Sequence, residues 1–147
     1  MRAYPLGNPA QAISPDALAA WGVLSWRVAG EAERAPMIES IKREHGYVDE
    51  DFIELGADTP NLDVICAKFD KEHYHTEDEV RYVVEGAGIF DVRDEGDEWV
   101  RIEVGEGDII VIPANKYHRF YLTEQKRIRC MRLFANHDGW APLYRAE

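Results

Sequence analysis

The stretch from residue 72 to residue 88, EHYHTEDEVRYVVEGAG, decides the fold. His73 and His75 are two residues apart, so on an extended strand both imidazoles point to the same side. Glu79 follows four residues after His75 and opens a run rich in Val and Tyr. A short turn between the two segments would bring its carboxylate to the imidazoles. A histidine pair alone is typical of a solvated turn, but the pair followed by Glu79 indicates a metal site between two strands.

Short apolar runs separated by turn residues continue from this stretch to residue 134. The polar segment Asp94-Glu95-Gly96-Asp97 is typical of a hairpin loop, and the other intervals are equally short. The expected strands are 62–69, 80–85, 88–93, 98–104, 108–112, 118–122 and 128–134. Strands this short and regular, with no helical pattern among them, predict a mainly β fold, either an antiparallel barrel or a double-sheet jelly roll.

The first sixty residues have a different pattern. Ser14-Pro15-Asp16 is a helix start, so a helix is expected over 15–21 with its end at Gly22. A second helix is expected over 36–45, with a short strand over 23–28 between the two. At 147 residues the chain fits one domain. We expect N-terminal helices and strand over about 1–60, and a barrel over about 61–135.

The charge balance limits the classes of partner. With 17 Lys and Arg against 28 Asp and Glu, the net charge is -11, which argues against nucleic acid and against polybasic membrane binding. No apolar run approaches the ~20 residues of a membrane span, and the N-terminus lacks a signal-peptide pattern. We therefore expect a cytoplasmic protein. Cys66 and Cys130 both lie in apolar, strand-like runs and are expected to be buried thiols.

A third histidine completes the set of candidate metal ligands. His118 follows Gly107 and Pro113 and begins another expected strand, so it can reach the site from across the barrel. Three imidazoles and one carboxylate suit Fe(II), Ni, Mn, Co or Zn. Four protein ligands on an octahedral ion leave two positions for a substrate or O2.

Two spaced motifs in the chain resemble those of the cupin superfamily, whose fold is a double-stranded β-helix. They are His73-x-His75-x3-Glu79-x6-Gly86 and Gly107-x5-Pro113-x4-His118. Asn115 stands where the second motif usually has Gly, and asparagine tolerates the same left-handed backbone. Within the superfamily the chain is similar to the acireductone dioxygenases. The segments that carry this similarity are 72–82, 84–88, 118–120, 131–134 and 139–140.

The resemblance implies a metal-dependent dioxygenase of methionine salvage. Its substrates are an enediol, 1,2-dihydroxy-3-keto-5-methylthiopentene, and O2. One Fe(2+) or Ni(2+) ion per chain is implied: iron enzymes of the family yield 4-methylthio-2-oxobutanoate and formate, and nickel enzymes yield 3-methylthiopropanoate, formate and carbon monoxide. We expect a monomer. The alternatives are another cupin metalloenzyme, a dioxygenase or isomerase with a different substrate, and a non-catalytic cupin that binds a small ligand.

The resemblance assigns His73, His75, Glu79 and His118 to the metal. Strand alternation independently places Arg81 on the same inward face as Glu79. Arg81 either stabilises an enediolate dianion, as the resemblance implies, or only neutralises a buried acid. Arg132 is a second catalytic candidate from the resemblance, with a surface charge as the alternative.

Four more residues have weaker expectations. Phe120 shares the face of His118 and is expected to line the substrate pocket, and Trp140 is expected to cap it, although simple core packing suits both aromatic side chains. Glu72 and Asp78 flank the ligands in sequence. They are expected either to orient the imidazoles or influence metal loading, or to belong to a solvated turn.

Overall fold

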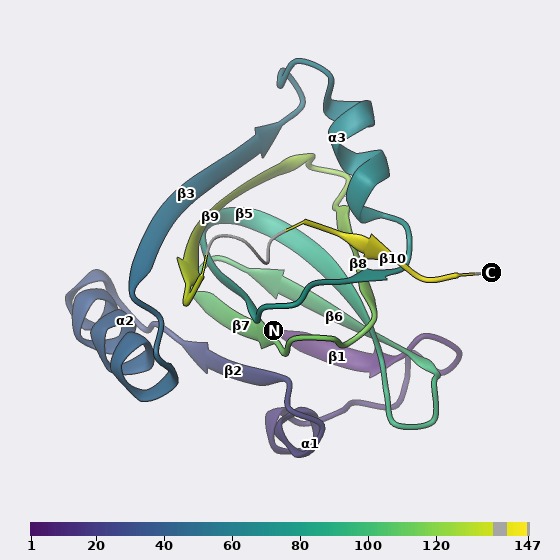
Figure 1. Cartoon of the computed structure of the whole chain (residues 1–147), viewed down its shortest axis with the longest axis horizontal. Coiled ribbons are helices and arrows are strands. Elements are labelled where there is room, and N and C mark those ends of the chain that lie inside the picture. Colours follow the sequence, from purple (N-terminus) through teal and green to yellow (C-terminus); the bar gives the residue numbers. More distant parts are fainter. Residues whose placement is uncertain (137–140, 147) are drawn as a thin grey trace.

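The long strand β5 (Glu79–Arg93) is shared by two sheets and organises the fold. The computed structural model describes residues 1–136 and 141–146 (Figure 1). The first half of β5 pairs with β7 (Asp108–Ile112) and β9 (Arg127–Phe134). Its second half pairs with β6 (Trp99–Gly105) and β8 (His118–Leu122). All of these pairings are antiparallel, so the two sheets face each other across a common interior.

Shorter strands extend both sheets. One sheet has the order β1-β6-β5-β8-β4-β10, and the other places β2 beside β7 and β3 beside β9. These strands are β1 (Arg2–Pro5), β2 (Leu24–Arg27), β3 (Asp49–Gly56), β4 (His73–Tyr74) and β10 (Leu143–Tyr144). The mainly β class is confirmed. Three of the strands come from the first sixty residues, so this part of the chain contributes to the sheets as well as supplying helices.

Two helices from the first third lie outside the strands (Figure 1). In α1 (Pro15–Ala20) the hydroxyl of Ser14 accepts a hydrogen bond from the amide of Ala17, as the helix-start pattern predicts. The second helix, α2 (Glu31–His45), begins five residues earlier than expected. It ends at Gly46, whose φ of 76° is left-handed. No helix in the described ranges has the length and hydropathy needed to cross a bilayer.

Side-chain alternation on β5 separates two clusters of buried residues. Val83, Phe90 and Val92 pack with β6 and β7 residues inside the barrel. Val80 and Tyr82 pack instead in a second cluster with Ile38 and Ile41 of α2, on the outer side of the sheet. The opposite face of the same strand segment carries Glu79 and Arg81 into the interior. Helix α2 therefore covers the back of the strand that presents these two charged groups.

The prediction of a strand over 62–69 is wrong, because this segment is helix α3 (Leu62–Phe69). Its apolar residues recur at a helical spacing of three and four residues, and a run of eight is too short to separate a buried strand from a helix. Cys66 is consequently a partly exposed helical residue, whereas Cys130 is buried in β9 as expected. Burial raises the pKa of the Cys130 thiol to about 11.

The two strands expected over 80–85 and 88–93 form a single strand, because Gly86 bends it instead of ending it. The register with β9 shifts between Val83 and Glu85, and Gly86 has a φ of 81°. A Cβ atom at this position would clash with the carbonyl group of Arg127. The glycine therefore lets the chain pass from one sheet to the other while the backbones stay close together.

Replacing Gly86 with alanine is expected to lower the free energy of unfolding by about 2 kcal/mol or more, because the new side chain adds a clash to left-handed strain. Urea denaturation measures this change. A Cβ on Gly7 would meet no atom within 4 Å. The control Gly7→Ala is therefore expected to stay within about 0.5 kcal/mol of the parent protein. Equal effects of the two substitutions would contradict the role given to Gly86.

Candidate metal centre

Three buried imidazoles meet where β4 and β8 pair. His73 lies directly opposite His118 in the register of these strands, and His75 follows two residues after His73. The ring centroids of His73 and His118 are 4.5 Å apart, and that of His75 lies 5.0 Å from the first and 5.2 Å from the second. One ring nitrogen from each residue lies within 4.8 Å of the others. The chain thus contains a three-histidine site.

Backbone carbonyl groups hold the orientation of all three rings. The Nδ1 atom of His73 lies 2.6 Å from the carbonyl oxygen of Lys71, and that of His118 lies 2.9 Å from the one of Lys116. The Nδ1 atom of His75 is 3.2 Å from the carbonyl oxygen of Ala141. A carbonyl only accepts, so each Nδ1 carries the proton. The Nε2 lone pairs are therefore available to a metal ion.

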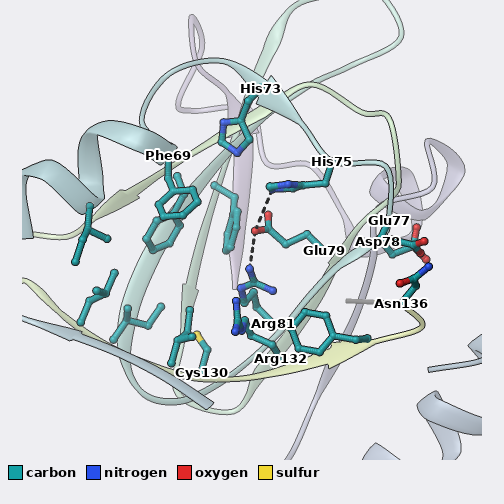
Figure 2. A pocket seen from close by; sticks show the side chains of 17 residues that line it. Phe69, His73, His75, Glu77, Asp78, Glu79, Arg81, Cys130, Arg132 and Asn136 are labelled. Atoms are coloured by element: carbon teal, nitrogen blue, oxygen red, sulfur yellow. Dashed lines mark hydrogen bonds and ion pairs between the residues drawn. The ribbon is translucent and has the colours of Figure 1, made fainter. Parts of the chain in front are cut away.

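Glu79 brings a carboxylate beside His75 and His118, and Figure 2 shows it next to His75. Its Oε1 accepts a hydrogen bond of 2.8 Å from Arg81 and lies 3.7 Å from Nε2 of His75. Its Oε2 lies 2.9 Å from Nε2 of His118. Within the described residues, however, Oε2 and the Nε2 atoms of His75 and His118 are buried with no hydrogen-bond partner. Such buried, unpaired atoms fit a divalent cation, which would satisfy them together.

Two arginines line the cavity beside this cluster. Arg81 and Arg132 lie opposite each other in the β5–β9 register. Arg81 donates to Glu79 and to the carbonyl oxygen of Val80, whereas Arg132 donates two hydrogen bonds of 2.7 and 2.6 Å to Asp51 on β3. Arg129, of opposite parity on β9, stacks on the Phe52 ring instead. The site therefore has two inward cations, each already beside a carboxylate.

The cavity has a volume of about 180 Å³ and is lined largely by apolar side chains. Phe120 is among them and packs against Phe90 with ring centroids 5.0 Å apart, so its two expected roles, pocket wall and core residue, coincide. Trp140 lies outside the described residues. The cavity also reaches Glu77, Asp78 and Asn136, on the right of Figure 2.

The model of the "ARD/ARD' family" matches residues 5–142 of the chain. The acireductone dioxygenase of Branchiostoma floridae is 42% identical over 145 residues, which cover 98% of this chain and 81% of that protein. The chain belongs to the ARD/ARD' family. A family member from Dictyostelium discoideum is 38% identical over 99% of both chains. The solved acireductone dioxygenase of Bacillus anthracis, with a cadmium ion in its active centre, has a TM-score of 0.88, 29% identity and 97% coverage of both chains.

These similarities confirm the predicted family and its mainly β cupin fold. The match to the ARD/ARD' model begins at residue 5, so it also includes most of the first sixty residues, where no motif was found. All four residues that the motifs single out, His73, His75, Glu79 and His118, lie together in the structure of this family member. Their role as ligands is part of the function proposed below.

In this family member, backbone carbonyl oxygens occupy all three Nδ1 atoms of the imidazoles, and Glu72 and Asp78 have other hydrogen-bond partners. Glu72 accepts hydrogen bonds from Arg93 and Arg145. Asp78 accepts from the hydroxyl of Tyr47 and the amide of Ala114, so it ties the first motif to the loop before His118. The spacing of the motif residues does not predict the contacts of Glu72 or those of Asp78, because their partners are distant in sequence.

The electrostatics of the cluster keep its groups in the form that binds metal. Burial, and then the neighbouring His118, lowers the pKa of His73 to about 4. Burial also lowers the pKa of His75, against the opposing effect of Glu79. For Glu79, burial alone would raise the pKa, but the charge of Arg81 and the contact with His118 hold it well below its usual range. At neutral pH His73 and His75 are therefore neutral and Glu79 is ionised.

The metal-free protein is expected to lose about 2 kcal/mol of stability between pH 7 and pH 5. His73 has a pKa of about 4 when folded and 6.5 when unfolded, so the unfolded chain binds more protons as the pH falls through this window. The lowered pKa of His75 also reduces stability as the pH falls. The lowered pKa of Glu79, in contrast, affects stability only below pH 4.5. Urea denaturation at the two pH values measures the loss. His73→Gln should flatten the pH dependence, and an unchanged slope would contradict this origin.

Proposed function

We propose that this enzyme is an acireductone dioxygenase that holds one Fe(2+) or Ni(2+) ion through His73, His75, Glu79 and His118. Its substrates would be 1,2-dihydroxy-3-keto-5-methylthiopentene and O2, as in methionine salvage. The observation that carries the proposal is the buried cluster of two unpaired Nε2 atoms and one unpaired carboxylate oxygen, directly beside Arg81. Family membership supports the reaction, and the cadmium ion in the Bacillus anthracis relative supports a metal in this position.

The chemistry requires an enediol that has lost its protons, since the dianion reacts with O2 more readily than the neutral form. A divalent ion at the site would supply Lewis acidity and positions for two substrate oxygens. Arg81 contributes a guanidinium beside the cluster, which favours the dianion in a largely apolar cavity. Arg81 contacts Glu79 and also lines the cavity, which supports a role towards the substrate besides the neutralisation of that acid.

The cavity explains how an acidic protein can bind an anion. The net charge of -11 describes the whole chain, whereas the cavity gathers Arg81 and Arg132 from opposite strands. Each guanidinium is held by a neighbouring carboxylate, and a metal ion would add two positive charges. Apolar residues around these charges exclude water and protect a reactive enediolate from side reactions.

The function is tested with protein loaded anaerobically with Fe(2+) or Ni(2+), mixed with the acireductone and then exposed to O2. Substrate absorbance should decay faster than with metal-free protein. Carbon monoxide should form only with the nickel form, and 4-methylthio-2-oxobutanoate only with the iron form. Decay no faster than that of the metal-free control would overturn the proposal. Metal analysis of protein from its own source identifies the native ion, and sedimentation tests the monomer that we expect in the cytoplasm.

A further inference from the structure

The cavity has a charged end and an apolar end, and β9 runs between them. Arg132, Cys130 and Ile128 alternate towards the cavity along this strand. Arg132 lies opposite Arg81 on β5, whereas Ile128 lies opposite Leu55 on β3. Four residues at about 3.3 Å each separate the two ends by about 13 Å. A substrate whose enediol lies beside Arg81 therefore directs its remaining chain along β9, towards Ile128.

Helix α3 closes the apolar end. Phe69 and Ile65 are one helical turn apart and both line the cavity, whereas Val64 points to solvent with 60% of its surface exposed. The ring of Phe69 lies 6.1 Å from that of His73. No residue of α3 is fully buried. Its contribution is an apolar wall.

The other walls of this end are also apolar and closely packed. Gly88 faces Phe120 and Ile128, and a Cβ atom on it would lie 2.6 Å from the Phe120 ring. The described residues that line this end are Ile53, Leu55, Ile65, Phe69, Phe90, Phe120 and Ile128. None of these side chains can pair with a hydroxyl group, so a hydroxylated chain would lose its hydrogen bonds to water without replacement.

We propose that Ile65, with Phe69 on the same helix and Leu55 on β3, selects the substrate by contacting the chain that its enediol carries. The wall accepts an enediol that carries an unbranched apolar chain, such as methylthioethyl, and rejects chains that are hydroxylated or too long. This inference rests on the proposed function, because that function places the enediol at the charged end. Recognition of the substrate's apolar chain is thus assigned to α3, and recognition of its enediol to the metal site and Arg81.

The test compares Ile65→Phe with the matched control Val64→Phe, which adds the same ring to the exposed side of the same helix. Metal-loaded protein is assayed with the methylthioethyl acireductone and with a short analogue that carries a single methyl group. The parent protein should prefer the long chain by at least about tenfold in kcat/KM. Ile65→Phe should lose about tenfold or more with the long chain and less than twofold with the short one. Val64→Phe should change neither value.

Anaerobic calorimetry separates this inference from the proposed function, because both enediols persist without O2. If nickel-loaded protein binds them with the same selectivity but never consumes O2, the proposed function fails and the role of Ile65 stands. The inference is overturned if Ile65→Phe weakens the binding of both enediols equally, or if the Val64→Phe control weakens binding as much. It is also overturned if neither enediol binds. Ile65→Ala gives the opposite check. It should improve binding of an analogue whose chain is two methylene groups longer.

Discussion

Replacing His118 with alanine is expected to weaken metal binding at least 100-fold and to reduce enediol oxidation to the rate of the metal-free protein. Removal of a group that only orients a metal ligand costs about 10- to 100-fold in affinity, and removal of a ligand costs more. His118 lies 2.9 Å from the carboxylate of Glu79 and opposite His73, so no other described imidazole can replace it. Metal content after dialysis and a titration with Ni(2+) measure the loss.

His45→Ala is the matched control, because it removes the imidazole at the end of α2. That ring packs against Trp26 and Tyr47 with centroid distances of 5.7 and 5.9 Å. Its loss should lower stability slightly and leave metal content unchanged. If the His118 variant kept one ion per chain while the His45 variant lost it, the assignment of the metal to the three-histidine site would fail.

The core of the site could be predicted from sequence because its geometry is mostly local. Residues two apart on a strand share a face, which places His73 with His75 and Glu79 with Arg81. The turn of Thr76, Glu77 and Asp78 then brings both pairs together. His118 is farther along the chain, and only its position at the start of a strand after Pro113 indicated that it joins them. In the structure it pairs directly with His73.

The contacts that support the site could not be predicted, because they join distant segments through groups without a sequence pattern. The carbonyl oxygen of Ala141 holds His75 from 66 residues away, and any residue type could supply it. Asp51 reaches Arg132 only because β3 pairs with β9, and no pattern in the sequence indicates the strand β3. The apolar run over 62–69 fits a strand as well as helix α3, so the wall that α3 gives the cavity could not be predicted either.

Replacing Arg81 with alanine is expected to lower kcat/KM for the acireductone by about 100- to 1000-fold while most of the metal stays bound at neutral pH. Loss of one donor to a developing negative charge has an effect of this size. The metal should remain, because the three imidazoles are unchanged and a bound divalent ion itself favours the ionised form of Glu79. Anaerobic spectra of the bound substrate measure how much of it is the dianion, independently of turnover.

Arg81→Lys and Arg127→Ala distinguish catalysis from structural support. Lysine keeps the positive charge but not the planar guanidinium, so it should restore part of the dianion signal. Arg127 is an exposed arginine on β9 that pairs with Glu54 and Glu85, and its replacement should alter neither metal content nor turnover. Arg81 also neutralises Glu79, so a variant that lost metal in proportion to activity would identify it as a support for the ligand alone. Turnover lost with the metal retained would instead place Arg81 in contact with the substrate.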